Sequence, residues 1–212
     1  MEKFVMLENY NVNEDGVIYQ VDRSPFDYTN GYNNYLSRIK ELSKYNSYSR
    51  LGYIIGSIGK VPNSILDVGY GIGDFLEACE QIPNRYGHDI SGYPIPEGCI
   101  FVDSMMSQHY DVITFFDSLE HMDDIEFVKD LQCNYVCISV PNCHYFDDEW
   151  FANWKHRKPN EHLWHFNEQS LKSFMSRMGY TCINTCNIED NIRKNNQPYS
   201  NILTGVFKKN EY

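Results

Sequence analysis

The chain has 212 residues, of which 42% are hydrophobic and 15% aromatic, so it can form the core of one domain. Charged residues make up 22% of the sequence, a moderate share that argues against extensive disorder. The formal net charge of −11 argues against an exposed nucleic-acid duplex or a membrane surface as the main partner. No apolar run is long enough to span a bilayer and no signal sequence is evident, so we expect a cytoplasmic protein.

The seven cysteines are scattered through the sequence, and no two of them form a Cys-x-x-Cys pair. Their number is odd and several lie in apolar runs, which predicts reduced, buried thiols. The spacing argues against a structural zinc site.

Residues 1–60 form an N-terminal extension in this interpretation. A short strand is predicted at 16–21, after the Asp15-Gly16 turn. Apolar residues at helical spacing then predict one helix from Tyr32 to about Tyr48 and a second one from Ser49 to Ile58. The extension is either a packing element or a helical lid over a ligand, and the sequence leaves both open.

Residues 61–212 alternate between predicted strands and helices, which indicates a mostly parallel sheet with helices on both faces. The second and third strands are separated by only ten residues rich in glycine and proline, so no crossover helix is expected between them. We predict strands at 65–68, 85–90, 99–102, 110–116, 135–140, 180–187 and 203–208, and helices at 73–81, 125–131 and 167–178.

A glycine-rich turn follows the first of these strands and runs from Gly69 to Gly73. Alternating glycines allow a ligand to approach the backbone, and the helix that follows aims free N–H groups at it. The position that would complete a dinucleotide-binding fingerprint holds Asp74 instead of glycine. A negative charge at a helix N-terminus suits a cationic or amine-bearing ligand better than a pyrophosphate.

The Asp-x-Gly-x-Gly-x-Gly pattern from Asp67 to Gly73 resembles the first motif of class I S-adenosylmethionine (AdoMet) methyltransferases. The resemblance extends over about residues 63–208. It implies a Rossmann-like α/β fold with a seven-stranded sheet, in which six strands are parallel and the last is antiparallel. It also implies AdoMet as the cofactor.

Several acidic residues are candidates for holding that cofactor at the ends of strands. Asp89 lies 22 residues after Asp67, a spacing at which an acid can bind ribose hydroxyls. The resemblance implies that Asp67 orients the cofactor amine and that Asp103 meets the adenine amino group. The full set expected at the cofactor is Asp67, Gly69, Tyr70, Gly71, Gly73, Asp89, Ile90, Asp103, Ser104, Phe116 and Asp117.

The loop at 142–166 contains all three tryptophans and several histidines. Long loops of this kind are usually functional, and aromatic walls with a few polar groups are typical of small-molecule pockets. Its Glu161–Phe166 segment resembles the substrate-side loop of a ubiquinone-biosynthesis-like branch of these methyltransferases. That resemblance makes His162 the leading candidate for a general base, followed by His165 and His121, either of which could instead be a packing residue.

No metal is expected in this loop, because His162 and His165 are three residues apart and match no standard spacing. The candidate ligands weighed were His144, Asp147, Asp148, Glu149, His156, Glu161, His162 and His165.

The predicted activity is AdoMet-dependent methylation, at oxygen or nitrogen, of a small polar or aromatic molecule such as a sugar, nucleotide or phenol. One alternative is a non-catalytic AdoMet sensor or partner subunit. Another is a nicotinamide oxidoreductase, which the glycine spacing disfavours. Nucleic acid and membrane are not expected as partners, and a homodimer is left open.

Overall fold

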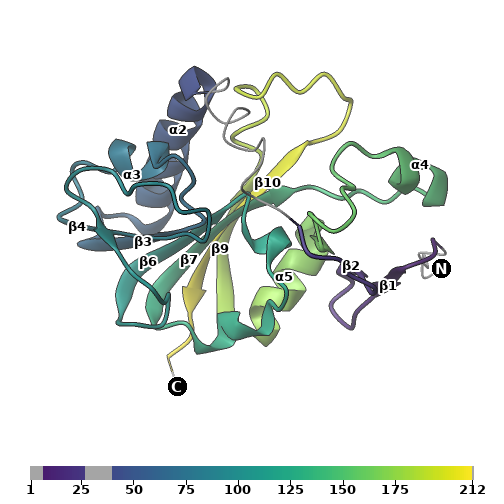
Figure 1. Ribbon diagram of the computed structural model, residues 1–212, viewed down its shortest axis with the longest axis horizontal. Helices are drawn as coiled ribbons and strands as arrows, with labels where there is room; N and C mark the ends of the chain where they lie inside the picture. The colour runs from purple at the N-terminus through teal and green to yellow at the C-terminus, as the bar shows by residue number, and fades with distance from the viewer. Residues whose placement is uncertain (1–6, 27–39, 212) are drawn as a thin grey trace.

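The computed structural model describes residues 7–26 and 40–211. A twisted sheet forms the centre of the molecule, in the order β5-β4-β3-β6-β7-β10-β9 (Figure 1). Its strands are β3 (Ser64–Val68), β4 (Asn84–His88), β5 (Ile100–Phe101), β6 (Tyr110–Phe116), β7 (Cys133–Pro141), β9 (Tyr180–Cys186) and β10 (Ile202–Lys209). The α-helices are α2 (Lys40–Ile58), α3 (Asp74–Ala78), α4 (Asp148–Asn153) and α5 (Glu168–Arg177), and the 3₁₀ helices are η1 (Leu119–His121) and η2 (Glu126–Asp130).

The central strands are apolar on both sides because helices cover both faces of the sheet. On one face Leu66 belongs to a buried cluster that includes Leu171 and Phe174 of α5. On the other face Ile65 belongs to a cluster that includes Ile54 of α2 and Phe75 of α3. The prediction of helices on both faces is therefore confirmed.

The strand directions also agree with the prediction. Strands β5, β4, β3, β6 and β7 pair in parallel, whereas β10 is antiparallel to both β7 and β9. Six strands thus share one direction and β10 runs against them. Strand β3 lies between β4 and β6, which is the point where the strand order reverses and where ligands of open α/β sheets bind.

Some element boundaries differ from the expectation. The predicted interruption at Ser49 is wrong, because α2 is continuous from Lys40 to Ile58. The part of the first predicted helix before Lys40 lies outside the described residues. The helix expected at 73–81 ends at Ala78, and the one expected at 125–131 is the 3₁₀ helix η2. No helix occurs between β4 and β5, as predicted.

A second, smaller sheet joins the N-terminal extension to the long loop. Strands β1 (Tyr10–Val12) and β2 (Ile18–Gln20) form an antiparallel pair, and β2 also pairs with β8 (Trp164–His165). The Gln20 side-chain amide exchanges two hydrogen bonds with Asn160, one with its backbone and one with its side chain. The first described residues are therefore tied to the segment that carries the candidate histidines.

All seven cysteines are free; four are buried and three are half-buried. Within the described ranges, no helix is long and apolar enough to cross a membrane.

Candidate active site

The glycine turn lies at the carboxyl end of β3, and its backbone requires glycine. Gly69, Gly71 and Gly73 have φ values of +79°, +53° and +85°, in the left-handed region that side chains disfavour. A Cβ atom on Gly73 would lie 2.2 Å from Cγ of Pro96, and one on Gly69 would lie 2.7 Å from Cβ of Ser118. Both the conformation and the close packing thus explain the motif.

Asp89 lies directly against this turn. Its Oδ2 accepts a hydrogen bond of 2.8 Å from the N–H of Gly71, and its Oδ1 accepts one of 2.6 Å from the N–H of Ser91. The Tyr70 hydroxyl donates a 2.6 Å hydrogen bond to the carbonyl of Tyr93. The loop between β4 and β5 therefore packs on the glycine turn and takes the place of the missing crossover helix.

Two further acids are buried at the turn. Asp67 is 3% exposed and accepts a 2.7 Å hydrogen bond from Oγ1 of Thr114. Burial raises the pKa of Asp67 to about 7. Asp74, at the start of α3, is 8% exposed, and its Oδ2 has no hydrogen-bond partner among the described residues. The unsatisfied carboxylate oxygen of Asp74 suits a ligand with a positively charged group.

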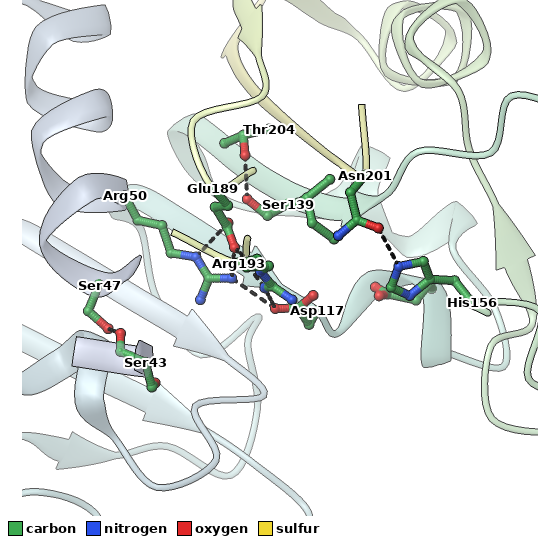
Figure 2. A network of polar contacts seen from close by, with 12 residues as sticks. Ser43, Ser47, Arg50, Asp117, Ser139, His156, Glu189, Arg193, Asn201 and Thr204 are labelled. Atoms are coloured by element: carbon green, nitrogen blue, oxygen red, sulfur yellow. Dashed lines mark hydrogen bonds and ion pairs between the residues drawn. The ribbon is translucent and has the colours of Figure 1, made fainter. Parts of the chain in front are cut away.

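A network of four charged side chains lies beyond the end of β6 (Figure 2). Arg50 of α2 contacts Asp117 at 2.8 Å and Glu189 at 2.8 Å. Arg193 contacts the same two acids from the segment between β9 and β10. Burial alone would raise the pKa of Asp117 and of Glu189, but the two guanidinium groups lower both below their ordinary values.

The network constrains the residues predicted at the end of β6. Asp117 has a φ of +52°, and its carboxylate is bound by Arg50 and Arg193. The Arg50 guanidinium also lies 4.3 Å from the ring centroid of Phe116. The charge of Arg50 also partly offsets the rise that burial causes in the pKa of Asp67.

The other predicted cofactor residues lie at the outer part of the same edge. Ile90 is 81% exposed and lies two residues after the end of β4. Asp103 and Ser104 are exposed in the segment after β5, where Oγ of Ser104 accepts a hydrogen bond from the N–H of Met106.

Two of the three predicted catalytic histidines lie side by side. The rings of His121 and His162 have centroids 4.6 Å apart. The third, His165, is 3% exposed and is surrounded by the rings of Tyr10, Phe151 and Trp154.

Burial lowers the pKa values of all three imidazoles. For His162 the pKa falls to about 2 and for His165 to about 3, while that of His121 also falls below its ordinary value. The imidazoles are therefore uncharged at neutral pH, and His162 is a weak proton acceptor.

A cavity of about 420 Å³ opens beside the long loop. Trp150 and Trp154 line it and stack on each other at 5.4 Å. Tyr199 and polar side chains complete the lining, namely Asp147, Glu149, Asn153, Lys155, Gln197 and Asn201. His156 contacts both the lining of the cavity and the histidine pair. Its Nε2 lies 2.9 Å from Oδ1 of Asn201, and its ring stacks on that of His162 with the centroids 6.3 Å apart.

A family model described as a methyltransferase domain matches residues 35–185. The chain belongs to this methyltransferase family. The class I recognition is thereby confirmed, and this methyltransferase uses AdoMet as its cofactor. A search of curated protein sequences found no match.

Solved structures support the fold of the methyltransferase. An AdoMet-dependent methyltransferase from Clostridium acetobutylicum has a TM-score of 0.59 at 12% identity, covering 86% of this chain and 100% of the other. Magnesium protoporphyrin IX methyltransferase from Synechocystis PCC 6803 has a TM-score of 0.58 at 14% identity, covering 86% and 91%. A 1,6-didemethyltoxoflavin-N1-methyltransferase from Burkholderia thailandensis has a TM-score of 0.57 at 14% identity, covering 96% and 100%.

Four residues of the methyltransferase site were not singled out from the sequence. Arg50, Glu189 and Arg193 belong to the ionic network, and Glu120 lies buried with its Oε1 3.9 Å from Nε2 of His121. The spacing of Glu189 and Arg193, four residues apart, was one available signal. Glu120 precedes His121 in the sequence, but this position alone does not indicate that its side chain is buried.

Proposed function

We propose that this methyltransferase transfers a methyl group to an oxygen or nitrogen atom of a small polar or aromatic molecule. The observation that carries the proposal is that the aromatic loop is bound to the segment after β6, whose Ser118 packs on Gly69 of the glycine turn. The N–H of Leu163 donates a 2.7 Å hydrogen bond to the carbonyl of Glu120 in η1, directly beyond the end of β6. Two of the solved structures are named for small-molecule methyl acceptors, magnesium protoporphyrin IX and 1,6-didemethyltoxoflavin.

In the proposed mechanism, the glycine turn and Asp89 hold the cofactor. The buried acids Asp67 and Asp74 favour its amine, and Asp103 lies where the adenine side is expected. When bound, AdoMet supplies a methyl group made electrophilic by the sulfonium. The chain then contributes chiefly alignment of the acceptor atom with that methyl, which is a proximity effect. His162 is the proposed catalytic residue and His121 its neighbour. Because the pKa of His162 is low, its role here is to accept a hydrogen bond from the acceptor's hydroxyl or amino group during transfer.

The aromatic cavity suits a ring-shaped acceptor. Stacked indole rings provide flat apolar area, and the acids and amides around them can hydrogen-bond hydroxyl or amino groups. A sugar, nucleoside or phenol combines both properties. We further propose a cytoplasmic location, an N-terminal segment that acts as a lid, and membership of the ubiquinone-biosynthesis-like branch.

A two-step measurement tests the activity. Calorimetry with AdoMet and S-adenosylhomocysteine measures cofactor binding, and methyl-labelled AdoMet with panels of phenols, sugars and nucleosides measures transfer. Binding with transfer to one of these classes is the expected result. Binding without transfer to any of them favours the sensor alternative, and absence of binding rejects both.

A further inference from the structure

Glu120 is a buried carboxyl group that accepts no hydrogen bond from the described residues, and Nε2 of His121 lies 3.9 Å from its Oε1. Its side chain is 1% exposed, and neither carboxylate oxygen has a hydrogen-bond donor in the part of the chain that the structure describes. An unsatisfied buried carboxylate is strongly unfavourable unless a proton or a cation accompanies it. Nδ1 of His162 is likewise buried and unpartnered among the described residues.

These groups converge on one point. One ligand atom each from Glu120, His121 and His162 can be chosen so that all three lie within 4.8 Å of one another. Ligand atoms around one tetrahedral ion at about 2.0–2.1 Å are about 3.3 Å apart. Small side-chain rotations would therefore bring the three atoms to an ion. We propose that Glu120, His121 and His162 bind one divalent transition-metal ion.

The backbone around the cluster is held in place on both sides. The N–H of Leu163 bonds to the carbonyl of Glu120, and the indole N–H of Trp164 bonds to the carbonyl of Met122 at 2.7 Å. The cluster thus unites two segments about forty residues apart, and their register is fixed by these hydrogen bonds. Such pre-organisation reduces the rearrangement needed on metal binding.

The donor set selects the class of ion. Two uncharged imidazoles and one carboxylate suit Zn²⁺, Fe²⁺ or Mn²⁺, whereas Mg²⁺ and Ca²⁺ prefer oxygen ligands throughout. Glu161 is not part of the set, because Lys158 binds its Oε1 at 2.7 Å. Three protein ligands leave coordination positions open.

The open positions give the ion a role that rests on the proposed function. Oxygen atoms of the methyl acceptor would fill the open coordination positions of the ion. The proposal therefore restricts the substrate to molecules that carry hydroxyl or carboxylate oxygens. In this role His162 acts as a metal ligand and not as a general base.

Metal titration of the whole chain tests the proposal. After chelator treatment, Zn²⁺, Mn²⁺ and Co²⁺ are titrated separately by calorimetry, and Co²⁺ is also followed by its visible absorption. The wild type should bind one ion per chain. Glu120→Gln, which preserves the side-chain shape, and His162→Asn, which removes the imidazole ring, should weaken binding tenfold or more. His109→Asn removes an exposed histidine before β6 and should leave binding unchanged.

Absence of stoichiometric binding to the wild type would overturn the proposal, as would equal affinity in Glu120→Gln, His162→Asn and the control. Circular dichroism identifies any variant that fails to fold, and the absence of the Co²⁺ spectrum from the wild type decides the question without variants. AdoMet is titrated into the same samples. Loss of AdoMet binding there counts against the proposed function, whereas loss of metal binding alone counts only against this site.

Discussion

The buried ionic network predicts a strong energetic coupling between Arg50 and Glu189. The Glu189 side chain is 0% exposed and that of Arg50 is 10% exposed. Removing one member of a buried pair typically costs about 3–5 kcal/mol, because it leaves a buried charge uncompensated. Arg193 still contacts Glu189, so we expect about 3 kcal/mol for Arg50→Met and about the same for Glu189→Gln.

The double variant should lose much less stability than the sum of the two single variants, with a coupling of about 2 kcal/mol. Urea unfolding followed by circular dichroism measures these free energies. Lys172→Met provides a control, because Lys172 pairs with Glu168 on the surface and should contribute less than about 0.5 kcal/mol. Additivity of the two single variants within about 0.5 kcal/mol would refute the reasoning.

The same network gives the effect of pH a definite sign. The pKa of Glu189 is lower in the folded chain than its ordinary value, so its stabilisation is present above that value. The stabilisation is lost as the pH falls below about 4.3 and through the folded-state pKa. The stability difference between the wild type and Glu189→Gln should therefore shrink on acidification.

Three further predictions concern the cofactor and His162. Asp89→Ala removes the acceptor for the N–H of Gly71 and should weaken AdoMet binding about tenfold, or 1.4 kcal/mol, by calorimetry. Asp111→Ala, near the amino end of the central strand β6, should leave the affinity unchanged. Gly73→Ala should lower the free energy of unfolding by about 1–3 kcal/mol and abolish AdoMet binding, because the added Cβ would clash with Pro96. Native-like stability and AdoMet affinity in this variant would contradict the prediction. His162→Ala should reduce turnover while AdoMet affinity stays nearly intact, and an equal loss of both would reject a catalytic role.

The fold could be predicted from the sequence because its main signals are local. The apolar run before Gly69 and the turn glycines specify a strand and a tight turn by short-range sterics alone. The alternation of strands and helices then determines the sheet. The continuity of α2 through Ser49 could not be predicted, because packing of its apolar side against β3 outweighs the weak helix preference of serine and tyrosine.

The site was harder to predict because its key contacts join distant segments. Asp117 meets Arg50 and Arg193, which are 67 and 76 residues away in the sequence. The spacing of the histidines within the long loop gives no indication that His162 lies close to Glu120 and His121. Pairing His162 with Glu120 requires the hydrogen bond between Leu163 and Glu120, which no sequence period indicates.

The small sheet of β1, β2 and β8 holds the segment that contains His162 and His165 in position by pairing it with residues 10–20. Any change that pulls Tyr19 away from Trp164 also releases the strand next to His162. A bulky fusion or a proteolytic cut near the first twenty residues would thus loosen the segment that carries His162 and His165 while the large sheet stays intact. Preparations of this protein should be compared for activity only when their starting residue is the same.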